Sequence, residues 1–188
     1  MNTTLIKFAR FYASTKHVGQ LYNNALPYTQ HLEEVEDEVR MWFPYFYDQW
    51  WPFTYDSGWD IDFVQEQLIV VAWLHDVVED CRVDIKEIEE LFGYGIAYIV
   101  NAVTNQPGKN RAERNAATYP KILQDSRAVF IKLCDRLANV YRAGTFKEMY
   151  KKEYPDFRAA LYIKGMFDVL WQNLDRIMEY IPNQESQS

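Results

Sequence analysis

Residues 68–80 read LIVVAWLHDVVED, an apolar run that predicts a buried helix and ends in four ionisable side chains. Burying these side chains without partners would cost several kcal/mol each. On a helix, side chains four positions apart share a face, which pairs His75 with Glu79. Asp76 is paired with Asp80 in the same way. A divalent metal beside His75 and Asp76, with the last two carboxylates facing a water or substrate, would stabilise this arrangement. A solvated helix end is the alternative.

The composition indicates one globular domain of 188 residues with a substantial core, since 48% of the residues are hydrophobic and 25% are charged. A net charge of −7 argues against a broad surface for a nucleic-acid polymer, and the acidic run at 33–38 predicts a solvated helix face. We expect no membrane span, because the apolar run before His75 is too short, and no signal peptide, because basic residues interrupt residues 5–18. Cys81 and Cys134 cannot build a disulfide framework, so we expect reduced thiols and a cytoplasmic location.

Hydrophobic periodicity predicts an all-α fold, without an internal repeat or a strand hairpin. The expected helices cover residues 3–18, 27–43, 62–80, 85–92, 96–103, 128–140 and 157–181. Asn23-Asn24 predicts a turn, and Pro44 is expected to end the second helix. Residues 146–154 are expected to form a charged connector.

The aromatic-rich segment at 43–60 is the least regular part of the sequence. Its many aromatic side chains and two prolines do not suit a regular helix, yet the segment is too apolar for a disordered linker. A satellite core, a homodimer contact and a cover over the active site remain open. We expect this segment to be an insertion in a single domain at 1–182, followed by a disordered polar tail at 183–188.

Asp135 and His31 are two further side chains that stand out from their surroundings. Asp135 lies in an otherwise apolar helix, where an ion pair with Lys132 or Arg136 would explain it. A lone histidine such as His31 is more often simply hydrogen-bonded. Taken in order, however, His31, the pair His75-Asp76 and Asp135 resemble the metal-binding series of the HD-domain metal-dependent phosphohydrolases.

Further motifs make the resemblance closest to one branch of that family, the alarmone hydrolase domains of the Rel/SpoT type and their small stand-alone relatives. The chain shows the motifs in the order of that branch: KHVGQ at 16–20, PYTQH at 27–31, LHDVVED at 74–80, Phe92-Gly93 with Val103-Thr104, and KLCDRLAN at 132–139. The resemblance covers about residues 5–142 and implies an HD-domain helical bundle.

The resemblance implies one divalent metal ion. Its expected ligands are His31, His75, Asp76 and Asp135. Such a mixed nitrogen and oxygen donor set admits Mn²⁺, Fe²⁺, Co²⁺ or Zn²⁺, and the alarmone branch favours Mn²⁺. The same branch implies that Glu79 and Asp80 are catalytic, by orienting a water or transferring protons.

Two groups of residues are candidate substrate contacts. Tyr22 and Asn23 stand where the branch usually has an Arg-Lys pair, so that Tyr22 could stack on a base without the cationic contact. Asn139 agrees with a family residue near the ribose. Arg142 stands where the family tends to have threonine and could bind a phosphate.

A locally basic stretch supplies further candidates. Lys109, Arg111 and Arg114 could clamp the phosphates of a substrate, because positive groups near a metal site offset polyphosphate charge. An ordinary solvated loop and helix start is the alternative.

The function predicted from these residues is hydrolysis of a phosphorylated nucleotide, with removal of the 3′-pyrophosphate of a (p)ppGpp-type alarmone as the main hypothesis. The alternatives are an HD nucleotidase, a (d)NTP triphosphohydrolase or an NADPH phosphatase. A hypothesis of another class is an inactive module that binds a nucleotide or a protein. The expected partner is a small nucleotide, with a homodimer through residues 43–60 left open.

Overall fold

The computed structural model describes residues 3–22, 25–50, 60–141 and 147–180, and these are overwhelmingly helical. The helices are α1 (Thr3–Lys16), α2 (Tyr28–Trp50), α3 (Ile61–Leu74), α4 (Val77–Asp80), α5 (Ile85–Phe92), α6 (Tyr94–Val103), α7 (Arg111–Ile122), α8 (Ser126–Tyr141), α9 (Lys147–Leu161) and α10 (Asp168–Met178). The only strands in the described part are β1 (Leu21–Tyr22) and β2 (Leu26–Pro27). The predicted all-α class is confirmed.

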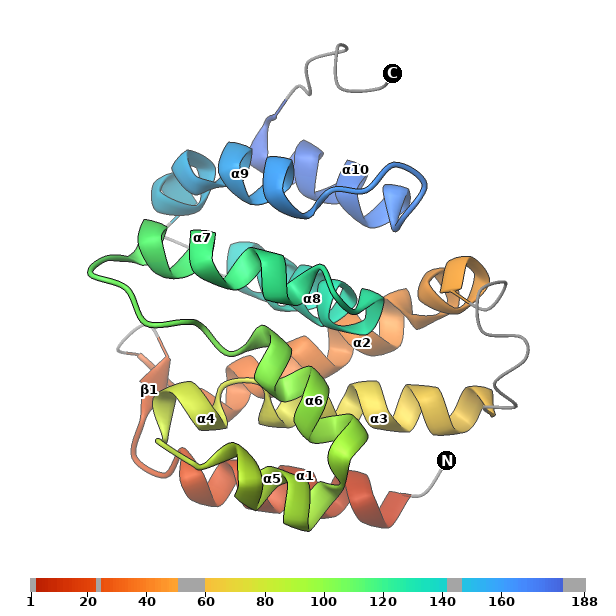
Figure 1. The fold of residues 1–188 in the computed structure, drawn as a ribbon, viewed down its shortest axis with the longest axis vertical. Helices are drawn as coiled ribbons and strands as arrows, with labels where there is room; N and C mark the ends of the chain where they lie inside the picture. Colours follow the sequence, from red (N-terminus) through yellow and green to blue (C-terminus); the bar gives the residue numbers. More distant parts are fainter. Residues whose placement is uncertain (1–2, 23–24, 51–59, 142–146, 181–188) are drawn as a thin grey trace.

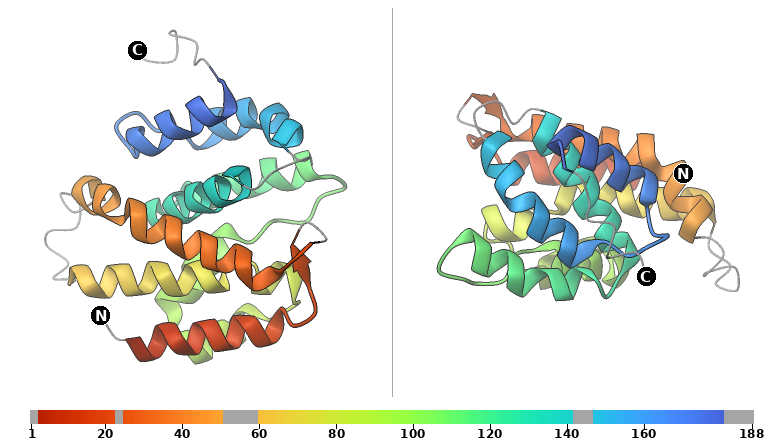
Figure 2. Two further views of the ribbon diagram at one scale, coloured as in Figure 1. Left: turned by 180° about the vertical axis from the view of Figure 1, so that it is seen from behind. Right: turned by 90° about the horizontal axis from the view of Figure 1, so that it is seen from above.

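Helix α3 lies at the centre of the bundle, in contact with α1, α2, α6 and α8. Figures 1 and 2 show the helices stacked along the long axis, with α1 and α5 at one end and α9 and α10 at the other. Every residue from Leu68 to Leu74 is buried, as the unbroken apolar run predicts. The chain therefore leaves the most deeply buried helix directly at His75.

The single helix expected over residues 62–80 is two helices, which corrects the prediction. Asp60 caps the start of α3 by accepting a hydrogen bond from the backbone N–H of Asp62. The pair His75-Asp76 then forms a turn between α3 and α4, in which Asp76 has φ −104° and ψ −6°. The backbone N–H of Asp80 still donates to the carbonyl of Asp76 at 2.8 Å. This small bend lets both side chains of the turn point into the same space.

The second helix does not end at Pro44, contrary to expectation, but continues to Trp50. A proline inside a helix removes one backbone hydrogen bond. Here Phe43 and Phe46 on either side of it are buried in the core, and the ring centroid of Phe46 lies 4.7 Å from that of Phe130. Tertiary packing of these rings offsets the cost of the proline. The first part of the aromatic segment thus belongs to the main core, and residues 51–59 lie outside the described residues.

The C-terminal part differs from the prediction in two ways. The expected connector at 146–154 is the first half of α9, and the expected helix at 157–181 is interrupted between α9 and α10. Gly165 and Phe167 have positive φ values of 84° and 59° in this interruption. Glycine favours a turn of this kind. The first half of α9 was missed for a different reason, because the charged residues of that segment show no helical pattern.

One buried carboxylate holds α9 and α10 together. Asp175 of α10 accepts hydrogen bonds from the hydroxyl of Tyr154 and from Nε of Arg158, both at 2.8 Å. All three side chains are buried. Contacts of this kind join residues that are distant in sequence and stabilise α9. Hydrophobic periodicity does not reveal such contacts.

A short antiparallel hairpin precedes α2, although no hairpin was predicted. Leu21 pairs with Pro27, and Tyr22 pairs with Leu26. The expected turn at Asn23-Asn24 lies outside the described residues. The strands contain only two residues each, too few for an alternating pattern to be recognised. The hairpin places Tyr22 against α2.

The acidic run at 33–38 is not uniformly solvated, which also corrects the prediction. Glu36 is buried and accepts hydrogen bonds from Arg10, Arg40 and the indole Nε1 of Trp73. Although burial alone would raise the pKa of Glu36, these donors lower it below its usual value. Glu36 therefore ties α1, α2 and α3 together.

No helix in the described part of the chain is long and apolar enough to cross a membrane. Cys81 and Cys134 are both free thiols, as expected.

Candidate active site

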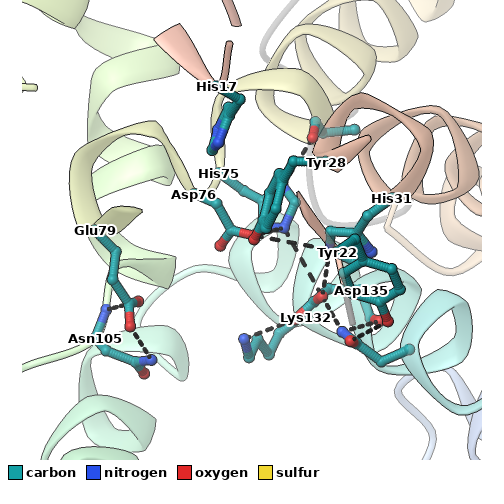
Figure 3. Close-up of polar contacts among 12 residues, drawn as sticks. His17, Tyr22, Tyr28, His31, His75, Asp76, Glu79, Asn105, Lys132 and Asp135 are labelled. Carbon is teal, nitrogen blue, oxygen red and sulfur yellow. Dashed lines mark hydrogen bonds and ion pairs between the residues drawn. The ribbon is translucent and has the colours of Figure 1, made fainter. Parts of the chain in front are cut away.

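The side chains of His31, His75, Asp76 and Asp135 converge from α2, the α3–α4 turn and α8 (Figure 3). One ligand atom from each of the first three lies within 4.8 Å of the other two. Asp76 Oδ2 is 2.9 Å from His75 Nε2 and 3.7 Å from His31 Nε2. Asp135 Oδ1 is 3.4 Å from His31 Nε2 and 3.8 Å from His75 Nε2. The structure thus brings together all four residues that the sequence predicted as ligands.

The backbone of α3 orients the imidazole of His75. Its Nδ1 lies 2.8 Å from the carbonyl oxygen of Ala72, which fixes a proton on Nδ1 and leaves the lone pair of Nε2 facing the other three side chains. Burial lowers the pKa of His75, but the carboxylates of Asp76 and Asp135 outweigh this and raise the pKa to about 9. The carboxylates of Asp76 and Asp135 therefore stabilise a positive charge at Nε2 of His75.

Asp135 uses its two oxygens differently. Oδ2 accepts a hydrogen bond from Lys132 Nζ at 2.7 Å, so the ion pair considered from the sequence exists, while Oδ1 faces the histidines. Burial would raise the pKa of Asp135, but Lys132 and the histidines hold it well below the usual range. Asp135 can therefore pair with Lys132 through Oδ2 and still offer Oδ1 as a metal ligand.

This donor set fits a divalent cation. Two imidazole nitrogens and two carboxylates surround one point, and His31, His75 and Asp135 are buried. His75 Nε2 faces the carboxylates of Asp76 and Asp135 at 2.9 and 3.8 Å, and burying two carboxylates so close together without a balancing cation is unfavourable. A bound cation would satisfy Nε2 and neutralise the two carboxylates.

Glu79 and Asp80 lie at the edge of the same cavity as the proposed ligands. Glu79 is exposed at the cavity mouth, where its carboxylate accepts hydrogen bonds from the backbone N–H and the side-chain amide of Asn105, at 3.4 and 3.1 Å. Partial burial and the nearby charge of Asp76 raise the pKa of Asp80. Both carboxylates are thus next to the four-residue cluster without belonging to it.

The cavity also has a basic wall. Arg111, Lys132 and Arg136 line it, and Glu153 accepts a hydrogen bond from Arg111 Nε at 2.5 Å and lies 3.6 Å from Arg136 Nη1. Of the predicted basic clamp, only Arg111 lines this cavity. Lys109 and Arg114 are not among its described lining residues.

The remaining predicted substrate contacts divide into two groups. Tyr22 and Asn139 line the cavity and touch each other, since the Tyr22 hydroxyl donates to Asn139 Oδ1 at 2.9 Å. Asn23 and Arg142 lie outside the described residues.

Several cavity residues, among them Tyr28, Arg136 and Tyr150, were not singled out from the sequence as substrate or ligand contacts. Tyr28 donates its hydroxyl to Asp76 Oδ2 at 2.6 Å, Tyr150 comes from α9, and Arg136 packs 4.9 Å from the centre of the Tyr150 ring. Tyr28 and Arg136 lie within the PYTQH and KLCDRLAN motifs on which the family resemblance rests, and these motifs could have pointed to them. Tyr150 lies in the segment predicted as a connector, and no sequence signal pointed to it.

Comparison with known proteins identifies the family. The family model described as "HD domain" matches residues 59–154, which is just over half of the chain. Two curated relatives are guanosine-3′,5′-bis(diphosphate) 3′-pyrophosphohydrolase of Spiroplasma citri, 30% identical over 149 residues, and a probable enzyme of the same name from Synechocystis, 35% identical over 128 residues. The alignments cover 76% and 62% of this chain but only 17% of each relative.

The fold is also similar to a solved structure. That structure, described as "A metazoan ortholog of SpoT hydrolyzes ppGpp and plays a role in starvation responses", has a TM-score of 0.71 and 23% sequence identity. The match covers 93% of this chain and 94% of the other, so the predicted helical bundle is confirmed over almost the whole chain. With the matching family model and the convergence of the two histidines and two aspartates, these findings show that the chain belongs to the HD-domain family.

Proposed function

We propose that this protein is a metal-dependent hydrolase that removes the 3′-pyrophosphate of a (p)ppGpp-type nucleotide. The observation that carries the proposal is the cavity in which the four-residue His/Asp cluster, two further carboxylates and a basic wall meet. Its curated relatives with this activity share about 30% identity with the chain, which supports the same reaction here.

We propose His31, His75, Asp76 and Asp135 as the ligands of one divalent ion. Their nitrogen and oxygen donors admit several metals, and Mn²⁺ is the first choice because the alarmone branch that the chain resembles favours it. A bound ion of this kind would lower the pKa of a water molecule and offset the charge of a phosphate. Lys132 keeps Asp135 ionised, and His75 does the same for Asp76, whose Oδ2 also accepts a hydrogen bond from Tyr28.

Glu79 and Asp80 are the proposed proton-handling groups. Asn105 holds the Glu79 carboxylate at the cavity mouth, so that it can accept a proton from a water that attacks the phosphorus. As the water oxygen bonds to the phosphorus, the bond from that phosphorus to the ribose 3′ oxygen breaks. Asp80, whose pKa is raised, is the proposed donor of a proton to this 3′ oxygen of the departing GDP. The products of this hydrolysis of ppGpp are GDP and pyrophosphate.

The basic wall is the proposed site for the phosphates of the substrate. Arg111 and Arg136 share the carboxylate of Glu153, which leaves donors on both guanidinium groups for phosphate oxygens. The cavity has a volume of about 190 Å³, below the roughly 300 Å³ of pockets that enclose a drug-sized ligand. It suits the diphosphate end of a nucleotide, with the nucleoside at its mouth.

A substrate panel tests the proposal. Purified protein with Mn²⁺ would be given ppGpp, dGTP and NADPH, and release of pyrophosphate, triphosphate and phosphate would be measured separately. We expect pyrophosphate from ppGpp. Triphosphate from dGTP or phosphate from NADPH as the dominant product would identify another HD activity, and nucleotide binding without turnover would indicate a binding module.

The cytoplasmic location and the homodimer through residues 43–60 stay predictions. Analytical ultracentrifugation of the purified chain would measure the oligomeric state.

A further inference from the structure

The two histidines of the cluster are oriented by different means. His75 has the usual arrangement of a metal-binding histidine, whose second ring nitrogen donates to a carbonyl or carboxylate. That acceptor is the carbonyl oxygen of Ala72, 2.8 Å from Nδ1. His31 is 2% exposed, yet its Nδ1 has no hydrogen-bond partner among the described residues. Something other than a hydrogen bond on Nδ1 must fix the angle of the His31 ring.

Aromatic rings fill that role. The ring of Tyr22 is stacked on His31, with centroids 4.7 Å apart and planes 8° from parallel. The ring of Tyr28 meets His31 edge-on, at 5.7 Å and 80°. Tyr22 and Tyr28 are themselves in edge contact at 6.2 Å. Because β1 pairs with β2 immediately before α2, the backbone holds Tyr22 over the first turn of the helix that carries His31.

The hydroxyl of Tyr22 enters a saturated hydrogen-bond network around Asn139. Asn139 Oδ1 accepts from Tyr22 and from Tyr150, both at 2.9 Å. Asn139 Nδ2 donates to the backbone oxygen of Asp135 at 2.8 Å and to Asp135 Oδ1. An amide offers two donors and two acceptor positions, so these four contacts use all of them. The side-chain amide of Asn139 can be oriented in only one way, because the two Asp135 oxygens that face Nδ2 can only accept hydrogen bonds.

From these contacts we infer that Tyr22 is a positioning residue for the metal ligands rather than a stacking surface for the base. Its ring fixes the angle of His31, and its hydroxyl, through Asn139, fixes Asp135. Tyr150 braces the same amide from α9. Asn139 correspondingly positions Asp135 and has no remaining hydrogen-bonding group for a ribose. This inference rests on the proposed metal site and replaces the substrate contacts expected for Tyr22 and Asn139.

The affinity for Mn²⁺ distinguishes a Tyr22 that positions the metal ligands from a Tyr22 that only stacks on the base. Mn²⁺ would be titrated into the metal-free full chain by calorimetry for the wild type, Tyr22→Leu, Tyr22→Phe and Tyr150→Phe. Loss of a group that orients a ligand typically weakens metal binding about 10–100-fold, and we expect Tyr22→Leu to fall in that range. Tyr22→Phe keeps the ring on His31, so it should rescue most of the affinity. Tyr150→Phe also removes a hydroxyl from the same amide oxygen without uncovering His31, so its Mn²⁺ affinity should match that of Tyr22→Phe rather than that of Tyr22→Leu.

A second readout needs no metal. The chain has three histidines, so His31→Gln and His75→Gln variants assign their ring signals in proton NMR spectra of the metal-free protein. In the wild type, the ring current of Tyr22 should shift the His31 signals upfield. Tyr22→Leu should move them downfield while the His75 signals stay in place.

The outcomes are distinct. Unmoved His31 signals, or Mn²⁺ affinity of Tyr22→Leu within 2-fold of the wild type, would overturn the positioning role. A wild-type protein that binds no Mn²⁺ would instead contradict the proposed function, and the NMR comparison would still decide whether Tyr22 orients His31.

Discussion

The two sides of the candidate metal centre are built in different ways. His75 and Asp76 occupy a turn at the end of the most buried helix, where the backbone orients the imidazole. His31 and Asp135 lie on two separate helices and are oriented by side chains from a hairpin and from α9. The backbone-built side should tolerate loss of neighbouring side chains better than the side-chain-built side.

Removing a ligand from the backbone-built side should have the largest effect. Asp76→Ala should abolish Mn²⁺ binding and turnover, because Asp76 Oδ2 lies within 3.7 Å of both histidine Nε2 atoms. Metal content and pyrophosphate release would be measured, with circular dichroism to show that the helices remain. Asp156→Ala, on the exposed surface of α9, is the matched control. Undiminished Mn²⁺ binding by Asp76→Ala would refute the ligand assignment.

Glu79→Gln should have the next largest effect. A positioned acid–base group contributes about 10²–10⁴-fold to a rate, so we expect kcat to fall by at least about 10²-fold while Mn²⁺ affinity stays the same. Glu90→Gln, on the exposed face of α5, is the control. A near wild-type kcat would show that Glu79 does not handle the proton.

Tyr28→Phe tests whether the backbone-built side also depends on a side chain. The Tyr28 hydroxyl donates to Asp76 Oδ2 at 2.6 Å, and its loss should weaken Mn²⁺ binding about 10-fold, the low end for a hydrogen bond to a ligand. Tyr98→Phe on α6 is the control. A larger loss for Tyr28→Phe than for Tyr22→Leu would reverse the comparison between the two sides.

Glu36→Gln should change stability more than activity. Glu36 joins α1, α2 and α3, and hydrogen bonds to a charged group suggest a loss of about 2 kcal/mol in the free energy of unfolding at pH 7. The pKa of Glu36 is lowered by folding, so its contribution is present above its unfolded pKa and is lost as pH falls through the folded pKa.

Urea denaturation of both proteins from pH 7 downward would measure this effect. The difference between wild type and Glu36→Gln should shrink below about pH 4.5, the usual pKa of the carboxyl. A difference that is independent of pH would show that the ionised carboxylate is not what stabilises the three helices.

The parts predicted from sequence are those with local signals. Leu68 to Leu74 form an unbroken apolar run, and α5 covers residues 85–92 as the periodicity predicts, with Asp84 capping its start and Gly93 following at positive φ. His31 was assigned as a ligand only because the order of the four residues resembles that of the HD-domain family, whereas His75, Asp76 and Asp135 stood out as polar residues beside apolar runs. Such signals need only a residue and its neighbours along the chain.

The parts that were missed depend on contacts between distant residues. α2 continues past Pro44 because Phe46 packs on Phe130, and α9 forms against α10 through Asp175. Tyr150 reaches the cavity only because of α9. The side-chain-built half of the metal centre was therefore the harder half to predict.

Anomalous X-ray diffraction at the manganese edge, from crystals grown with Mn²⁺, would locate the metal ion itself. We expect one strong peak bounded by Nε2 of His31 and His75 and by carboxylate oxygens of Asp76 and Asp135. A peak at another place, or no peak in crystals of protein that has taken up Mn²⁺ in solution, would contradict the ligand assignment.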